Sequence, residues 1–281
     1  RGGARRPTYR QFGAFHKTGV FLTRDIARLS CRALGWDTSA CWRGPGGWVD
    51  TCRAEAPRGT DCSMLHRDEA IEGRKNRIMF FFRSSHSQVV SGYLYHKSGK
   101  EGWTRARGDD VKRVLKNLRA QLQSDPQADD FHQNESWSSY LRRIPTRRGL
   151  YAEMLYDEVN TMGKMRDMYT RCRRRPHHCN ITCIDWLIAA NDTMIRAVWG
   201  SIFAFAQHSQ GEQTCLLQQI MVYYQAYAAR KNQSGHTTSA TTSRDELHYL
   251  QQVVADLDRR LFNNSYISQP WNPLCLGPPQ L

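Results

Sequence analysis

The sequence lacks an uninterrupted apolar run long enough to cross a membrane. Its longest apolar stretch, 186–206, is broken by Asp192, Arg196 and Ser201, whereas a transmembrane helix needs about 20 consecutive apolar residues. The sequence begins at Arg1 with no hydrophobic leader, so we expect any secretion signal to have been removed. These features argue against a single-pass membrane protein. The hydrophobic fraction of 40% argues against a disordered chain.

Recognisable catalytic motifs are also lacking. The chain contains no phosphate-binding glycine loop, nucleophile elbow, His-Glu-x-x-His or Cys-x-x-Cys. The acidic residues are scattered and give no support for a catalytic carboxylate pair. We therefore expect a protein that is not an enzyme and that needs no cofactor. A secreted hydrolase that uses His177 or His178 for acid–base chemistry is the alternative.

Acidic residues are scarce relative to basic ones, and the imbalance lies in one half of the chain. The 281 residues include 40 Lys and Arg against 26 Asp and Glu, a net charge of +14. Residues 1–148 carry 28 basic and 15 acidic residues, a net charge of +13, and residues 149–281 carry 12 and 11. This asymmetry predicts an anionic partner for the front half: a nucleic acid, a sulfated glycan or an acidic membrane surface.

Asparagine spacing predicts the compartment. Five of the 10 Asn open an Asn-x-Ser/Thr triplet, the acceptor of N-linked glycans, and all lie at or beyond residue 134. They are Asn134, Asn180, Asn191, Asn232 and Asn263. We therefore expect a secreted protein, extracellular or displayed on a virion or cell surface. Its thiols would be oxidised there.

The chain has nine cysteines, which in an oxidising compartment are expected to form disulfides. Because nine is an odd number, at least one cysteine must stay free or bond another chain. One set is expected to staple the front segment: Cys31, Cys41, Cys52 and Cys62. A second set is expected to tie helices together: Cys172, Cys179, Cys183 and Cys215. Cys275, on a Pro-rich tail, is expected to be free or to bond another chain. In an intracellular protein, five residues could instead form a zinc site: His177, His178, Cys172, Cys179 and Cys183. For a secreted protein we expect disulfides and no bound metal.

Periodicity predicts strands and one helix in residues 76–122. The apolar runs 78–82 and 89–95 have the length and composition of strands, with a third short strand expected near Trp103. A helix is expected from Asp109 to Leu122, because its apolar residues recur with a 3.6-residue period. The opposite face of that helix carries a basic stripe: Lys112, Arg113, Lys116 and Arg119.

The rest of the chain is predicted to be a linker followed by helices. Residues 123–148 are polar and contain a basic group: Arg142, Arg143, Arg147 and Arg148. Helices are expected over 150–172, 184–207, 212–231 and 244–262, and four helices of this length suggest a bundle. We thus predict an α+β chain with three parts. These are a basic, disulfide-stapled β-β-β-α module (1–122), a linker (123–148) and a glycosylated helical bundle (149–281).

Residues 62–122 resemble a chemokine. The segment Gly92-Tyr-Leu-Tyr-His-Lys-Ser-Gly99, then Trp103, then 110–118 is similar to the second strand, basic turn, third strand and final helix of that family. Residues 77–85 resemble the first strand and its turn in that family. Cys62 lies where a chemokine has one of its N-terminal cysteines. Chemokines usually carry two disulfides, whereas this chain has no cysteine between Cys62 and Cys172. A chemokine-like module joined to a helical domain is similar to cytomegalovirus chemokine homologues and chemokine-like envelope subunits.

These observations predict a secreted or surface-displayed, viral-type immunomodulatory binding glycoprotein that assembles as an oligomer. Its basic residues would bind sulfated glycosaminoglycan such as heparin: Lys112, Arg113, Lys116, Arg119, Arg142, Arg143, Arg147 and Arg148. The resemblance implies a chemokine-type receptor or a partner glycoprotein as a further partner. Two alternatives remain, a disulfide-tethered subunit of an envelope glycoprotein complex and a nucleic-acid-binding virion protein, the latter not favoured.

Overall fold

The computed structural model of the chain describes residues 9–14, 20–34, 62–64, 76–106, 118, 131–132, 135–188, 191–230 and 242–276. The chain forms two compact units, each built from separated stretches of sequence. Unit 1 comprises residues 1–84, 165–229 and 273–281, and unit 2 comprises residues 85–164 and 230–272. This division does not follow the expected order of a front module, a linker and a back domain.

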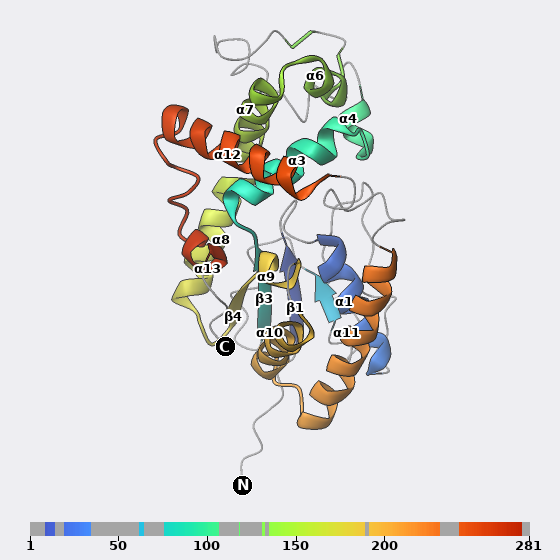
Figure 1. The fold of residues 1–281 in the computed structure, drawn as a ribbon. Coiled ribbons are helices and arrows are strands. Elements are labelled where there is room, and N and C mark those ends of the chain that lie inside the picture. Colours follow the sequence, from blue (N-terminus) through green and yellow to red (C-terminus); the bar gives the residue numbers. More distant parts are fainter. Residues whose placement is uncertain are drawn as a thin grey trace. The chain divides into compact units, whose positions relative to one another are not determined.

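Unit 1 is built on a sheet of four parallel strands (Figure 1). The strands are β1 (Tyr9–Ala14), β2 (Cys62–Met64), β3 (Asn76–Phe82) and β4 (Cys179–Cys183), in the order β2-β1-β3-β4. Its helices are α1 (Val20–Ala33), most of α8 (Gly163–Arg174), α9 (Ile184–Ile188), α10 (Asp192–Phe205), most of α11 (Gln210–Arg230) and most of α13 (Asn272–Leu276).

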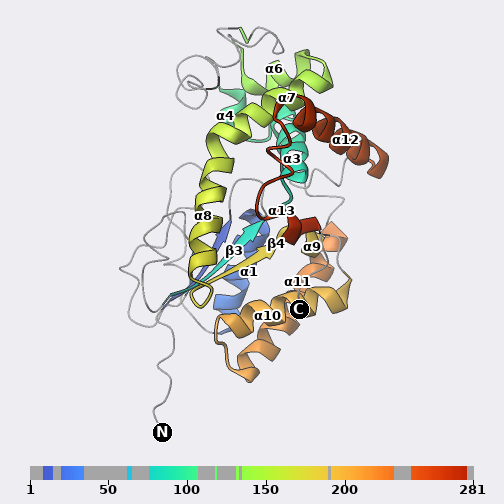
Figure 2. The ribbon, with the colours of Figure 1, turned by 90° about the vertical axis from the view of Figure 1, so that its left-hand side faces the viewer.

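Strand β3 lies inside the core of unit 1. All five residues of the run 78–82 are buried, as expected for a central strand of a parallel sheet covered on both faces. Met79 and Phe81 belong to a cluster with residues of α1, α10 and α11, and the Phe81 ring lies 5.7 Å from that of Trp199. On the opposite face of the sheet, Phe82 contacts Tyr169 of α8 edge to face at 5.9 Å, and Figure 2 shows α8 running beside the sheet. The strand predicted at 78–82 is therefore confirmed.

Unit 2 is helical. It contains α3 (Ser85–Lys97), α4 (Gly102–Arg105), α6 (Trp137–Arg143), α7 (Thr146–Asp157), the π-helical turn η2 (Glu158–Met162) and α12 (Arg244–Leu261). Helix α3 packs against α6, α7 and α12. Aromatic rings fill the space between α4, α6 and α7: Trp103 stacks on Tyr156 at 5.3 Å, and Trp137 stacks on Tyr140 at 5.4 Å.

The strand predicted at 89–95 is wrong, because these residues belong to α3. Val89, Val90, Tyr93 and Tyr95 favour strands by propensity and are all buried. Because three helices surround α3, most of its sides are buried and few of its positions need polar residues. Its sequence therefore lacks the alternation of apolar and polar residues, with a period of 3.6, that marks a helix with one exposed face. A short buried helix of this kind cannot be told from a buried strand by periodicity.

Several other expectations for the front half also need correction. The strand expected near Trp103 is the short helix α4. The front part of the chain also contains β1 and the 14-residue helix α1, which the expected β-β-β-α module did not include. Of the helix expected over 109–122, only Leu118 is described; it is helical and buried. The three antiparallel strands of the β-β-β-α module are not found among the described residues.

The expectations for the back half hold for its helices but not for their assembly. The helix expected over 150–172 is observed as α7, η2 and α8, and those expected over 184–207, 212–231 and 244–262 as α9 with α10, α11 and α12. Helices α10 and α11 pack on the sheet of unit 1, while α7 and α12 belong to unit 2. Within the stretch expected to be a linker, Trp137, Tyr140 and Leu141 are buried in the core of unit 2.

Candidate functional site

The strand order of unit 1 defines an edge at which ligands bind in sheets of this kind. Strand β1 lies between β2, which follows it through α1, and β3 on its other side. The strand order therefore reverses between β1 and β3. In open parallel sheets, ligands bind outside the carboxyl ends of the strands, at such a reversal.

Arg83 and Asp185 lie at this edge, directly after β3 and shortly after β4. Arg83 Nε donates to Asp185 Oδ1 at 3.0 Å, and the backbone N–H of Ser84 donates to Asp185 Oδ2 at 2.8 Å. Both carboxylate oxygens are thus bonded, and Asp185 fixes the guanidinium to the end of β3. The Arg83 side chain is 18% exposed. This arrangement presents a held, partly desolvated cation at the carboxyl ends of the strands.

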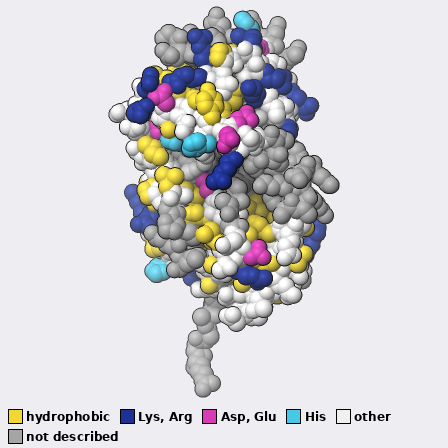
Figure 3. All heavy atoms as spheres, viewed as in Figure 1, with side chains coloured by type: hydrophobic (Ala, Val, Ile, Leu, Met, Phe, Trp, Pro, Cys, Tyr) yellow, Lys and Arg dark blue, Asp and Glu magenta, His cyan; other side chains and the backbone are white. Residues whose placement is uncertain are grey.

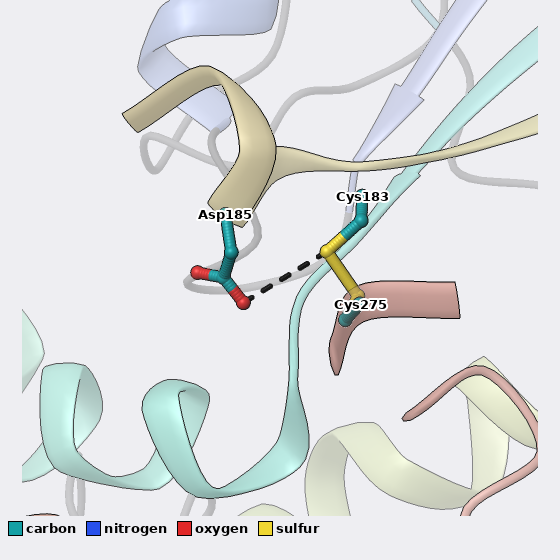
Figure 4. A group of neighbouring side chains, drawn as sticks. All are labelled: Cys183, Asp185 and Cys275. Carbon is teal, nitrogen blue, oxygen red and sulfur yellow. Dashed lines mark hydrogen bonds between the residues drawn. A yellow bond between two sulfur atoms is a disulfide. The ribbon is translucent and has the colours of Figure 1, made fainter. Parts of the chain in front are cut away.

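A disulfide adjoins this pair. Cys183, at the end of β4, is bonded to Cys275 of α13, and its sulfur lies 3.8 Å from Asp185 Oδ2 (Figure 4). A disulfide sulfur carries no proton, so we treat this approach as a contact and not as a hydrogen bond. The ligand atoms of these three residues lie within 4.8 Å of one another, a spacing that could suit a metal. Metals bind thiolates, however, and the disulfide removes both.

The structure corrects the predicted roles of two cysteines. Cys275, expected to be free or intermolecular, is paired with Cys183, whereas Cys215, expected to be paired, is a free, half-buried thiol on α11. A second disulfide joins Cys172 to Cys179. Both cysteines belong to the set that was expected to pair among itself and tie helices together. It removes two ligands from the alternative zinc site. The pairing of Cys31, Cys41, Cys52 and Cys62 lies outside what the structure describes.

The histidines of the hydrolase alternative lie between α8 and β4. His177 is exposed, and its backbone carbonyl accepts a hydrogen bond from the Arg77 guanidinium. His178 is half-buried, and its carbonyl accepts from the backbone N–H of Ile78 at 2.8 Å. Both residues thus help to join the turn before β4 to β3 through their backbones.

A basic surface lies on unit 2, where α7 begins and α12 ends. Arg147, Arg259 and Arg260 all donate to Asp256 at 2.7–2.8 Å, a group that we call the Asp256 cluster. Hydrogen bonds from Arg147 and Arg259 lower the pKa of Asp256 to about 2. The cluster therefore keeps three cations around one anion. Figure 3 shows basic side chains crowded over the end of α12 at the upper left, with an acidic one among them.

Of the eight predicted glycosaminoglycan-binding residues, half can be placed. Arg142, Arg143, Arg147 and Arg148 are exposed on α6 and α7. Arg143 is bonded to Glu135 at 2.9–3.0 Å, so part of its charge is neutralised. The basic stripe lies outside the described residues: Lys112, Arg113, Lys116 and Arg119.

Sequence reasoning missed Arg259, Arg260, Arg83 and Asp185. Arg259 and Arg260 lie in the last turn of α12. Their adjacency near the end of the predicted helix 244–262 could have marked them as part of a basic surface. Arg83 and Asp185 are 102 residues apart, and only the pairing of β3 with β4 brings them together.

The predicted glycan acceptors differ in their surroundings. Asn191 is exposed and caps α10, since its Oδ1 accepts from the backbone N–H of Met194 at 3.0 Å. Asn263 is exposed in a turn after α12 with a φ of 51°. Asn180 is half-buried within β4. Asn134 and Asn232 lie outside the described residues.

Unit 2 also contains a buried network of titratable side chains. His96 Nδ1 lies 2.8 Å from Glu153 Oε1, and its Nε2 lies 3.4 Å from Glu101 Oε2. One helical turn beyond Glu153, both carboxylate oxygens of Asp157 accept from Gln88 Nε2 at 3.1 Å. Burial, followed by the nearby charge of Glu153, raises the pKa of Asp157 to about 7. We assign this network to the core of unit 2, since His96, Glu153 and Asp157 are all buried there.

Comparisons with known protein families, curated proteins and solved structures found no match for this chain. The search for membrane spans among the described residues found no helix with the length and apolar character required.

Proposed function

We propose that the protein binds a small phosphorylated ligand at the carboxyl ends of the strands of unit 1. The observation that carries the proposal is the position of Arg83, held by Asp185 beside the reversal of strand order. A guanidinium forms strong charge-assisted hydrogen bonds with phosphate, often two at once. The carboxyl edge of an open parallel sheet is where such sheets bind phosphorylated ligands.

Thermal unfolding and calorimetric titration with AMP, ADP, ATP and pyrophosphate test this proposal. We expect at least one of these compounds to raise the unfolding temperature. The variant Arg83→Lys keeps the charge beside Asp185 but loses the planar fork, so we expect roughly tenfold weaker binding or worse. Arg196→Lys, an exposed change on α10 of the same unit, is the matched control. Binding by none of the four compounds, or equal binding by both variants, would refute the proposal.

We also propose that the basic surface of unit 2 binds a sulfated glycan outside the cell, as the charge and the Asn-x-Ser/Thr triplets led us to expect. The Asp256 cluster supports this function, because it gathers three Arg side chains from two helices around a single carboxylate. Arg148 adds a fourth exposed cation next to Arg147 on α7. Multivalent contacts between such cations and sulfates are strong at low salt and are screened at high salt.

Heparin chromatography tests this second function. Replacing Arg147, Arg148, Arg259 and Arg260 with Ala should lower the salt concentration needed for elution. The control replaces the same number of exposed cations elsewhere: Lys100, Lys164, Arg174 and Arg196. Equal elution of the two quadruple variants would contradict the assignment. Elution by duplex DNA, but not by soluble heparin, would favour the nucleic-acid alternative instead.

The chemokine-type receptor and the envelope complex receive no further support as partners. Helix α3 occupies the residues that the resemblance gave to the second strand. Cys275, the proposed tether to another chain, is bonded within the chain.

A further inference from the structure

A cavity of about 290 Å³ opens beside β4 in unit 1. Its walls come from α8, the turn before β4, β4 itself, and α9, α10 and α13. Tyr169 and Trp186 contribute aromatic rings, and Arg173 and Ser201 contribute hydrogen-bond donors. Its volume is at the lower end of the range for small-molecule sites, so it has room for a single ring and not for an extended chain.

Asn180, which opens the triplet Asn180-Ile181-Thr182, also lines this cavity. The Thr182 hydroxyl donates to Asn180 Oδ1 at 2.9 Å and thereby fixes the carboxamide. The other carboxamide atom, Nδ2, is the one to which an N-linked glycan attaches. Within the described part of the chain, this atom has no hydrogen-bond partner.

We propose that this cavity holds the first N-acetylglucosamine residue of a glycan attached to Asn180. A glycan in the middle of a strand needs space next to its asparagine, and the cavity supplies that space. The side chains of Tyr169 and Trp186 at the cavity wall offer apolar contact to the C–H groups of the sugar ring. Arg173 is exposed at the wall and can donate to its hydroxyl or acetamido oxygens.

The attachment is a group transfer from a lipid-linked oligosaccharide diphosphate of the secretory pathway. Asn180 Nδ2 attacks the anomeric carbon of the sugar, an N–C bond forms, and the bond from that carbon to the diphosphate oxygen breaks. Nδ2 loses one proton, and the lipid diphosphate leaves with the electron pair. The transfer acts on the unfolded chain, so the position of Asn180 in β4 does not prevent it.

Two other acceptors provide internal controls. Asn191 and Asn263 are both exposed, and neither lines this cavity. If all three carry glycans, only the glycan on Asn180 should have a buried linkage to the protein. Occupancy at Asn191 and Asn263 shows that exposed triplets of this chain accept glycans in the secretory pathway, whereas protection at Asn180 tests the cavity. Neither readout depends on the phosphorylated ligand.

The experiment uses the full chain, secreted from mammalian cells behind an added signal peptide. Peptide mapping by mass spectrometry gives the occupancy of each acceptor. Peptide-N-glycosidase, which must reach the sugar–asparagine bond, is then applied to the folded protein over time. We expect release at least tenfold slower from Asn180 than from Asn191 or Asn263, and equal release after denaturation.

Ser201→Trp tests the cavity without removing a core side chain. Ser201 is exposed on α10 at the cavity wall, so an indole there should displace the sugar and bring release from Asn180 to the rate at Asn191. Ser201→Ala, which leaves the cavity open, should retain the protection. An unmodified Asn180, release as fast as at the exposed sites in the parent protein, or unchanged protection in Ser201→Trp would each overturn the proposal.

Discussion

Asp157 makes the stability of unit 2 depend on pH, and Asp157→Asn should remove that dependence. The pKa of this carboxyl rises from an ordinary 3.8 to about 7 on folding. The unfolded chain therefore releases its proton at lower pH than the folded chain does. The free energy of unfolding must then fall as pH rises from about 4 to about 7, by up to about 1.4 kcal/mol per pH unit. Above pH 7 the accumulated loss is about 4 kcal/mol.

The variant keeps the local hydrogen bonding. The carboxamide oxygen introduced by Asp157→Asn can still accept from Gln88 Nε2, and the new N–H₂ group can donate to Gln88 Oε1. That oxygen is buried and lacks a hydrogen-bond partner among the described residues. We therefore expect the variant to be less stable than, or equal to, the parent near pH 4 and more stable at pH 8.

Urea unfolding followed by tryptophan fluorescence at several pH values between 4 and 8.5 measures this. The informative quantity is the difference in unfolding free energy between variant and parent at each pH, because other titrating groups cancel in it. Asp167→Asn, an exposed change on α8, is the control and should give a flat difference. Parallel curves for Asp157→Asn and the parent across this pH range would refute the reasoning.

Four further predictions concern packing and thiols. Gly149→Ala should destabilise unit 2 by about 1–3 kcal/mol in urea unfolding, since the new Cβ would lie 2.6 Å from a tyrosine ring. Gly200→Ala, on a helix with open space around it, should instead stabilise by about 0.5–1 kcal/mol. Replacing Cys183 and Cys275 with Ser should cost roughly 2–4 kcal/mol in the same assay, because the bond closes a loop across 92 residues. Cys215, a half-buried free thiol, should react with a maleimide in the non-reduced folded protein, and a Cys215→Ser variant that reacts equally would contradict this.

Local sequence signals predicted those elements whose own pattern matches their surroundings. The run 78–82 forms a strand because it is apolar on both faces and lies at the centre of the sheet. Helix α12 has one apolar face, with Leu250, Val254 and Leu257 buried, so its period is visible in the sequence. Helix α3 is surrounded by other helices and shows no such period. Its prediction failed for that reason.

The candidate sites were less predictable because they depend on distant pairings. The parallel sheet joins β1, near the start of the chain, to β3 and β4, and no local pattern encodes that register. The Arg147–Asp256 bond joins residues 109 apart, so three of the four members of the Asp256 cluster could not be found from the basic group at 142–148. Exposed Arg side chains could be listed from the sequence. Their partners could not.

The Cys183–Cys275 bond also sets an order of events during synthesis. Cys172 and Cys179 leave the ribosome seven residues apart, so their bond can form early. Cys275 emerges only after both stretches of unit 2 have been made. Until then, Cys183 at the end of β4 still lacks its partner. A premature bond between Cys183 and an earlier cysteine is therefore a misfolding route for this chain, and thiol–disulfide isomerases would be needed to reverse it.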